Sequence, residues 1–339
     1  MADNCLKRPI HVLGAGGIGV ALGWSLARAG CEVLMVEALL EKVAAGRSAG
    51  IEVVGRPAAQ IEIIRFEHWE PSDEVVTLLC TKTYDNAAVL ARLGDGMRLV
   101  PVQNGFDPEL DRWGHAGEGI ASFVSECERD RPVTRITRAG SLHLGPRRGM
   151  TGEERADLME LAEVLEAGEL FRVEWVEDIR PYKATKLMYN AAVSPLAAAA
   201  GVDNGELLRD RLARRLFFAL LRENYGILKH ARIPLARIGP FHPDTVSRIL
   251  GTPGLPELMG HFFRPSLRGT YCSMAPDMAG EQTEVQAYNG HLIRLAGDFP
   301  CPLNRAVLSV VETIIRERLR PARERLLAVE ALWRGGGGG

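Results

Sequence analysis

The chain has 339 residues, of which 46% are hydrophobic and 25% are charged, and its formal net charge is −2. This length predicts two domains, and this composition is typical of a globular protein. A net charge near zero excludes a broadly basic surface, so we expect neither nucleic acid nor a membrane as a partner.

The six cysteines are scattered, with no C-x-x-C pair and no histidine spacing suited to zinc. We therefore expect no metal site and a reducing, cytoplasmic environment. The N-terminus has no apolar stretch of the kind found in signal peptides, and no uninterrupted apolar run is long enough to span a bilayer.

The first predicted elements surround a glycine-rich turn. A strand at residues 9–13 runs directly into Gly14-Ala15-Gly16-Gly17-Ile18-Gly19, and a helix at 20–29 and a strand at 32–36 follow. This context makes G-x-G-x-x-G a credible dinucleotide site. Gly14 permits the turn, Gly16 lets the backbone approach a pyrophosphate, and Gly19 lets helix and strand pack closely. We assign Gly17 and Ile18 to the same cofactor loop, where the helix N-terminus faces the phosphates.

An acidic residue, Glu37, ends the second predicted strand. A carboxylate at this place can accept hydrogen bonds from the ribose hydroxyls of NAD and would repel a 2′-phosphate. No arginine or lysine follows until Lys42. The sequence therefore favours NAD(H) over NADP(H); the alternative interpretation of Glu37 is an ordinary surface charge.

Two polar loops follow the next strands. We predict a strand at 75–80, a helix near 86–93 and a strand at 98–103, with Lys82 after the first strand and Asn104-Gly105 after the second. Such loops face the ligand crevice in a doubly wound sheet. Short strands at 120–124, 133–137 and 141–144, a helix at 152–166 and an exit segment at 171–176 complete an α/β, Rossmann-type domain at residues 1–176.

The pattern becomes helical from residue 177. Helices are predicted at 179–200, 207–231, 242–250, 281–296 and 306–329, separated by turns that carry proline or glycine. The sequence thus predicts an all-α domain at 177–334 and a flexible glycine tail at 335–339. A helical domain after a nucleotide-binding domain predicts an active site where the two domains meet.

Lysine is scarce in this chain, where six of the 41 basic residues are lysines, and Lys186 opens the pattern K-x-x-x-N-x-x-x-S. Steps of four residues place Lys186, Asn190 and Ser194 within about 80° of one helix face. A lysine can give up a proton, which arginine cannot. The alternative is a solvated helix face. Lys183, one turn earlier, could lower the pKa of Lys186 by repulsion, but we favour an ordinary surface residue there.

Several blocks of sequence together resemble the ketopantoate reductase (2-dehydropantoate 2-reductase) family. They run from the glycine-rich turn to Thr283-Glu284 and so cover nearly the whole chain. In order, they are the glycine turn, Lys82, Asn104-Gly105, the K-x-x-x-N-x-x-x-S-P block at 186–195, N-G-E-L at 204–207, S-M-x-x-D at 273–277 and T-E-V at 283–285.

The resemblance implies a Rossmann-type domain followed by a helical domain like the C-terminal part of 6-phosphogluconate dehydrogenase. It also implies an NAD(P)-dependent oxidoreductase that acts on CH–OH groups, reduces a 2-keto acid to a 2-hydroxy acid and serves pantothenate biosynthesis. Whether such an enzyme would be a monomer or a homodimer stays open.

The family's residue roles carry over to matching positions. Lys186 would protonate the ketone oxygen as general acid, and Glu284 would orient that lysine. Asn190 and Ser194 would hold hydroxyl or carboxylate oxygens of the substrate, and Ser273 would bind its carboxylate. Asn104 and Lys82 would lie near the nicotinamide and its ribose, with Asn104 also near the substrate. Among the histidines, His143 is the nearest alternative acid, and we favour a structural role for it.

The chain departs from the family at four positions, and these departures leave the substrate open. Ser194 replaces an asparagine, Ala184 a tryptophan, Ala197 a threonine, and Ala38 the arginine that would grip a 2′-phosphate. We expect an altered pocket and cofactor preference. One alternative is therefore an NAD-dependent D-2-hydroxy acid dehydrogenase for branched or aromatic 2-keto acids. Another, from a different class, is a non-catalytic NAD(H)-binding sensor.

Overall fold

The computed structural model describes residues 8–252, 254, 260, 264 and 267–335. Internal contacts divide the chain into two compact units: the first ends at Ile179 and the second begins at Arg180, with the short segment Gly105–Asp107 belonging to the second. The sequence predicted this boundary between residues 176 and 177. In the described part of the chain, no helix is both long and apolar enough to cross a membrane.

A parallel five-stranded sheet forms the centre of the first unit, and its strand order is β4-β2-β1-β5-β6. The strands are β1 (Ile10–Leu13), β2 (Val33–Glu37), β4 (Glu62–Arg65), β5 (Val76–Leu79) and β6 (Arg98–Pro101). The central strands are mostly apolar, apart from His11 in β1 and Thr77 in β5, because both faces of the sheet are covered. The strand order changes direction between β1 and β5, which is where parallel sheets of this kind bind ligands. The predicted Rossmann-type fold is confirmed.

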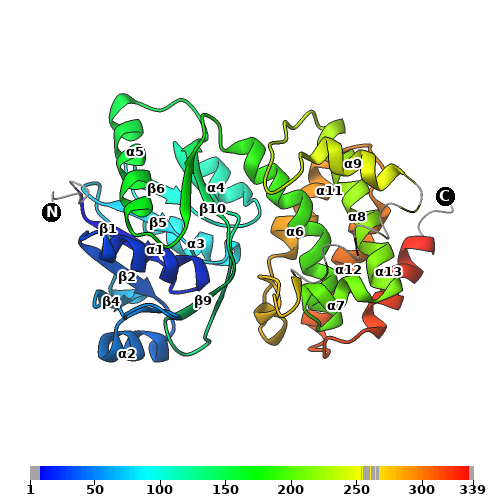
Figure 1. Ribbon diagram of the computed structural model, residues 1–339, viewed down its shortest axis with the longest axis horizontal. Helices are drawn as coiled ribbons and strands as arrows, with labels where there is room; N and C mark the ends of the chain where they lie inside the picture. Colours follow the sequence, from blue (N-terminus) through cyan, green and yellow to red (C-terminus); the bar gives the residue numbers. More distant parts are fainter. Residues whose placement is uncertain (1–7, 253, 255–259, 261–263, 265–266, 336–339) are drawn as a thin grey trace. The chain divides into compact units, whose positions relative to one another are not determined.

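Two hydrophobic clusters cover the two faces of this sheet. Ile10 and Val12 of β1 pack into the cluster that includes α1 and α5, whereas Leu13 packs into the cluster that includes α3 and α4. Helices α1 and α5 lie side by side (Figure 1). The helical elements of this unit are α1 (Gly17–Arg28), α2 (Leu40–Ala49), η1 (Phe66–His68), η2 (Thr83–Asp85), α3 (Asn86–Leu90), α4 (Pro108–Trp113) and α5 (Gly152–Ala167).

Two three-stranded sheets complete the first unit, with strand orders β11-β10-β7 and β3-β9-β8. Their strands are β3 (Glu52–Val53), β7 (Gly117–Ala121), β8 (Val124–Cys127), β9 (Val133–Arg138), β10 (Ser141–Pro146) and β11 (Arg172–Trp175). The prediction of one strand at 120–124 is wrong, because the chain leaves one sheet and enters the other there. Ser122 ends β7: its hydroxyl and its amide both bond to the Ser141 backbone.

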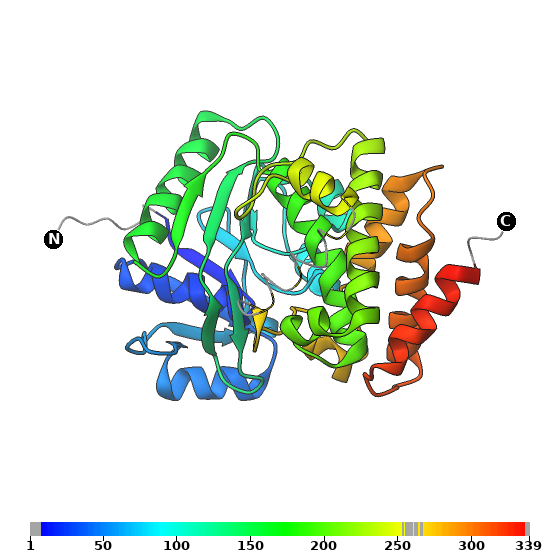
Figure 2. The same ribbon diagram turned by 45° about the vertical axis from the view of Figure 1, so that its right-hand side comes forward.

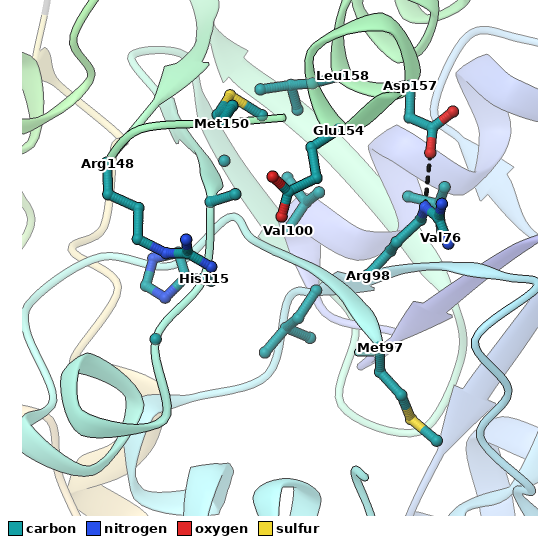
Figure 3. A pocket seen from close by; sticks show the side chains of 14 residues that line it. Val76, Met97, Arg98, Val100, His115, Arg148, Met150, Glu154, Asp157 and Leu158 are labelled. Atoms are coloured by element: carbon teal, nitrogen blue, oxygen red, sulfur yellow. Dashed lines mark hydrogen bonds and ion pairs between the residues drawn. The ribbon is translucent and has the colours of Figure 1, made fainter. Parts of the chain in front are cut away.

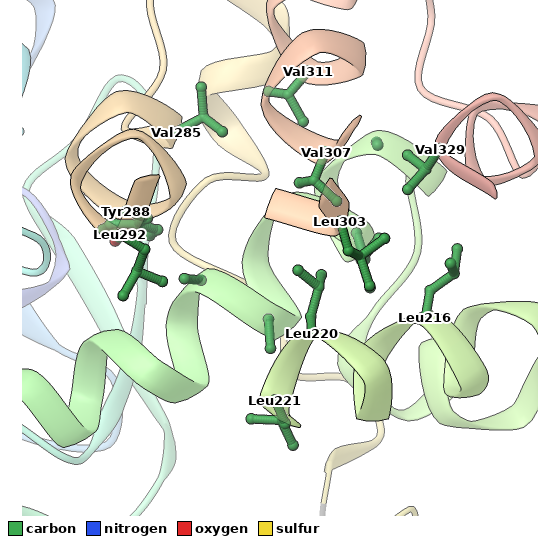
Figure 4. Close-up of a cluster of buried hydrophobic side chains, with 14 of the residues drawn as sticks. Leu216, Leu220, Leu221, Val285, Tyr288, Leu292, Leu303, Val307, Val311 and Val329 are labelled. Carbon is green, nitrogen blue, oxygen red and sulfur yellow. The ribbon is translucent and has the colours of Figure 1, made fainter. Parts of the chain in front are cut away.

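The described part of the second unit is helical. Its elements are α6 (Arg180–Ala200), α7 (Asn204–Arg209), α8 (Arg211–His230), α9 (Pro243–Gly251), η3 (Pro276–Ala279), the π-helical turn η4 (Gln286–Gly290), α11 (His291–Ala296), α12 (Pro302–Arg316) and α13 (Glu324–Gly335). Helices α12 and α13 pack side by side (Figure 2). Their apolar faces join α6 and α8 in one core, part of which is drawn in Figure 4.

Two of the predicted helices are broken in the structure. The helix predicted at 207–231 is interrupted at Asp210, whose extended backbone and side-chain bond to the amide of Ala213 begin a new helix. The helix predicted at 306–329 is interrupted after Arg316, where Arg318 takes a positive φ of 52°. Helix α13 continues to Gly335, so the first residue of the predicted tail is helical, and residues 336–339 lie outside the described residues.

Candidate functional site

The glycine-rich turn connects β1 to α1 in the first unit, and steric limits account for two of its glycines. Gly14 has φ +94°, and a Cβ there would lie 3.0 Å from the amide nitrogen of Thr81. A Cβ on Gly19 would overlap the carbonyl oxygen of Gly14. Both positions therefore require glycine if α1 is to pack this closely on the sheet.

Gly16 is different: among the described residues other than Gly16 and its two chain neighbours, no atom lies within 4 Å of the position its Cβ would take. It is the N-cap of α1 and makes no side-chain cap bond, so this helix end has amide groups to offer to a ligand. A Cβ on Gly17, by contrast, would lie 2.6 Å from Oγ of Ser125, and Ile18 packs against the core. The open side of the turn is thus at Gly16.

Glu37 lies at the end of β2, where its carboxylate is held by the backbone. Oε2 accepts a hydrogen bond from the amide of Ala15 at 2.8 Å, and Oε1 accepts bonds from the amides of Ala38 and Leu39 at 2.8 and 2.9 Å. Glu37 therefore fixes the glycine-rich turn to the start of α2. These three bonds give Glu37 a structural role, and its proposed contact with a ribose stays a prediction.

Lys42 also contacts the glycine-rich turn, and this role was not predicted from the sequence. The side chain is buried, and its Nζ donates to the carbonyl oxygen of Ala15 at 2.9 Å and to Sγ of Cys127 at 3.6 Å. Ala15 thus has its amide bonded to Glu37 and its carbonyl bonded to Lys42. The spacing of five residues between these two charged side chains, across the start of α2, is the signal that could have indicated the role.

The two polar loops follow β5 and β6, which are neighbours in the sheet. Lys82 is the N-cap of the short helix η2. A buried pair, Asn86 and Gln103, links the loops through two side-chain bonds of 3.2 and 2.8 Å. Asn104 comes next, and its Oδ1 is buried with no hydrogen-bond partner among the described residues. A buried acceptor of this kind is suited to a donor on a bound molecule.

Helix α6 carries Lys186, Asn190 and Ser194 in the second unit, as predicted from their spacing. Lys186 and Asn190 are partly exposed, whereas Ser194 is 2% exposed and lies among core residues. The interpretation of Lys183 as a surface residue is wrong: this side chain is 3% exposed, and its Nζ lies 4.9 Å from the ring centroid of Phe106. Ala184 and Ala197 are also buried in the core of this unit.

Ser273 and Glu284 are brought together by a residue that the sequence analysis did not name. The hydroxyl of Tyr288 lies 3.0 Å from Oγ of Ser273 and donates to Oε2 of Glu284 at 3.3 Å. Glu284 and Tyr288 are both buried. Burial, followed by the charge of Glu284, raises the pKa of Tyr288 well above its usual value. Tyr288 lies four residues after Glu284, a helical spacing that could have indicated the contact.

His143, the alternative acid, is buried in β10, and its Nε2 lies 3.3 Å from Oε2 of Glu174 on β11. Its place inside a sheet is that of a structural residue. Among the described residues, no group of three or more metal-binding side chains could hold a metal ion.

Two cavities of the first unit contain none of the predicted site residues. One, of about 60 Å³, has His115 and Arg148 on one side and Glu154 on the other, and room only for a few water molecules (Figure 3). The other, of about 510 Å³, lies at the amino ends of β1 and β2, where His11 and Glu32 line it. Ligands of doubly wound sheets bind at the carboxyl ends, so neither cavity is a candidate cofactor site.

Comparison with known proteins identifies relatives of both units. The family model described as Ketopantoate reductase PanE/ApbA matches residues 10–146, and the model for Ketopantoate reductase PanE/ApbA C terminal matches residues 178–314. A curated relative, the 2-dehydropantoate 2-reductase of Archaeoglobus fulgidus, is 26% identical over 313 residues, which cover 90% of this chain and 97% of the relative.

Solved structures have the same fold. The PanE/ApbA family ketopantoate reductase of Ralstonia eutropha JMP134 gives a TM-score of 0.71 at 21% identity, covering 91% of this chain and 99% of that one. The complex of D-mandelate dehydrogenase with NADH also gives a TM-score of 0.71, at 18% identity, covering 92% of this chain and 100% of that one. At these identities, the two structures support the fold alone.

Proposed function

Because the chain belongs to the ketopantoate reductase family, we propose that it is an NAD(P)H-dependent oxidoreductase that reduces a 2-keto acid to the corresponding 2-hydroxy acid. The observation that carries this proposal is the extent of the family match. Residues 10–146 contain the glycine-rich turn, and residues 178–314 contain Lys186, Ser273 and Glu284. A non-catalytic NAD(H)-binding sensor would need only the glycine-rich turn.

The first unit fits a nicotinamide dinucleotide. Gly16 presents backbone with no side chain over it, which suits the approach of a pyrophosphate. The buried, unpartnered Oδ1 of Asn104 suits a donor of the nicotinamide carboxamide or of a hydroxyl. When bound, the reduced cofactor supplies the hydride for the keto carbon.

The group that donates the proton is proposed to lie in the second unit. Hydride addition to a ketone leaves negative charge on oxygen, so a positioned acid must deliver a proton there. We assign this step to the ammonium of Lys186, which is partly exposed and can regain its proton from solvent. The buried carboxylate of Glu284 would keep the lysine charged and oriented. Asn190, on the same face of α6, would bind a substrate oxygen.

We further propose NAD(H) as the preferred cofactor. Glu37 uses three of roughly four acceptor positions for backbone amides, which leaves one for a ribose hydroxyl. The ammonium of Lys42 already donates to the carbonyl oxygen of Ala15 and to Sγ of Cys127, which takes up two of its three donor positions. Arg65 stands opposite Glu37 in the sheet register, but its Nη2 pairs with Glu67 at 2.6 Å. These contacts favour a site for a ribose without a 2′-phosphate.

Cofactor preference gives a direct test. We expect kcat/KM to be about tenfold or more higher with NADH than with NADPH, because a 2′-phosphate would meet the Glu37 carboxylate. Steady-state rates with both cofactors at a fixed keto acid concentration measure this ratio. Arg65→Ala is the control, and it should leave the ratio unchanged. A preference for NADPH that disappears in Arg65→Ala would instead assign a 2′-phosphate site to Arg65.

The substrate is tested by following NADH oxidation with ketopantoate, 2-ketoisovalerate and benzoylformate. We expect turnover of at least one of the three, because all share the 2-keto acid on which the proposed proton transfer acts. A preference for benzoylformate would favour a dehydrogenase for aromatic hydroxy acids. NADH binding without turnover of any would contradict the proposal and favour the sensor.

A further inference from the structure

The backbone on both sides of Ala15, in the glycine-rich turn, is held by two side chains of opposite charge. The amide of Ala15 donates to Oε2 of Glu37 at 2.8 Å, and its carbonyl oxygen accepts from Nζ of Lys42 at 2.9 Å. The first bond holds the peptide group between Gly14 and Ala15, and the second holds the peptide group between Ala15 and Gly16. Because a residue has only two soft backbone torsions, the two bonds together fix the conformation of Ala15.

The ammonium of Lys42 is buried without a carboxylate beside it. The side chain is 6% exposed, and among the described residues it forms no ion pair. Its second contact is Sγ of Cys127 at 3.6 Å, and burial raises the pKa of this thiol, which is therefore neutral. The same thiol donates to the Ala15 carbonyl oxygen at 3.4 Å. Burial of a charge without an opposite charge destabilises a fold, and exceptions of this kind are expected where function requires them.

The bond from Lys42 also sets the direction of the next amide. No described peptide bond is cis, and in a trans peptide the C=O and N–H groups point in opposite directions. The Ala15 carbonyl points toward Lys42, so the N–H of Gly16 points away from it. No hydrogen bond of the Gly16 amide is found among the described residues. This N–H is available to a bound molecule, on a residue with open space at its Cβ position.

We propose that Lys42 is a positioning residue for the dinucleotide, which orients the Gly16 amide toward the diphosphate of the cofactor by holding the Ala15 carbonyl. The positive charge at the carbonyl oxygen also polarises this peptide group and makes its N–H a stronger donor. An anionic phosphate oxygen is the matching acceptor. The inference rests on the proposed function and deepens it, because it identifies the residue that prepares the glycine-rich turn for the phosphates.

Lys42→Met tests this role, because methionine is apolar and similar in length to lysine. We expect Kd for NADH to rise about tenfold in a fluorescence titration, while kcat at saturating NADH changes less than about threefold. The melting temperature without cofactor should change by only a few degrees, since the variant loses a buried charge together with a bond. A large fall in melting temperature with unchanged Kd would instead assign a merely structural role to Lys42.

Arg47→Met is the matched control. Arg47 lies on the same helix, α2, and its Nε donates to the carbonyl oxygen of Ile63 at 2.9 Å, outside the glycine-rich turn. The variant loses the same kind of bond, from a cation to a backbone carbonyl, so Kd for NADH should stay within about twofold of wild type. An equal loss of affinity in Arg47→Met and Lys42→Met would contradict the inference.

A double-mutant cycle tests whether Lys42 acts through the Gly16 peptide. In Gly16→Ala, a methyl group occupies the space that the diphosphate needs, so the amide cannot make its contact. Adding Lys42→Met to this variant should then change Kd for NADH less than about threefold. A further tenfold loss would show that Lys42 acts independently of Gly16, and the inference would be wrong.

The proposed function and the inference fail separately. If wild type binds NADH but reduces no keto acid, the proposed function is wrong, and the affinity of Lys42→Met still decides the inference. Wild-type affinity in Lys42→Met overturns the inference and leaves the proposed function intact. If wild type does not bind NADH, both are wrong. Should Lys42→Met not fold, Lys42→Gln takes its place: its side chain is polar but one bond shorter, and the same loss of affinity is expected.

Discussion

Replacing Lys186 by alanine lowers kcat for keto acid reduction by about 100-fold or more, while the affinity for NADH stays within about twofold. The reason is that the ammonium both donates the proton and stabilises the negative charge that develops on the ketone oxygen. The cofactor contacts that we propose lie on the first unit, and Lys186 lies on α6 of the second. The measurement combines steady-state turnover with fluorescence titration of NADH.

Two further variants make the Lys186 test specific. Lys186→Arg keeps the positive charge but cannot release a proton at working pH, so it should bind NADH normally and turn over as slowly as the alanine variant. Lys229→Ala, the control, removes a half-exposed lysine whose Nζ lies 3.4 Å from Asp244 on the surface. It should keep wild-type turnover. Near-normal activity of Lys186→Ala would refute the assignment of the general acid.

Replacing Gly16 by alanine weakens NADH binding about 50-fold or more but changes the melting temperature little. Apart from Gly16 and its chain neighbours, no atom of the described residues lies within 4 Å of the new methyl group. The backbone of Gly16 is extended with φ −83°, which alanine adopts without strain. The methyl group would instead occupy the space into which a pyrophosphate must come. Titration with NADH and thermal unfolding without cofactor measure the two effects separately.

Substitutions at two other glycines provide the contrast to Gly16→Ala. Gly19→Ala should lower the melting temperature even without cofactor, because its methyl group would overlap the carbonyl oxygen of Gly14. Gly152→Ala is the matched control: it is the first residue of α5 and also has open space at its Cβ position, so both NADH binding and stability should be unchanged. Normal NADH binding by Gly16→Ala would remove the glycine-rich turn as the cofactor site.

Local patterns predicted most of the elements that position the site. The strand, turn and helix around Gly14, Gly16 and Gly19 could be predicted because the glycine pattern and both flanking elements lie together within a short stretch of sequence. Helix α6 was predicted to within one residue at its start, since its period continues through Lys186, Asn190 and Ser194. Two of the errors came where a side chain ends an element, Ser122 at the end of β7 and Asp210 at the start of α8, and a third came at the positive φ of Arg318.

The sequence by itself determined the order of the elements and supplied the candidate site residues, because a glycine turn, a strand-end carboxylate and a lysine on a helix can each be recognised within one element. Only the tertiary structure decided what each side chain bonds to. Lys42 lies 27 residues from its partner Ala15, and Tyr288 lies 15 residues from Ser273 and four from Glu284. Hydrogen bonds form between atoms that folding brings within about 3 Å, and for residues far apart along the chain, spacing alone does not specify such pairs. For that reason Ser273 could be proposed as a substrate contact from sequence, whereas its contact with Tyr288 required the fold.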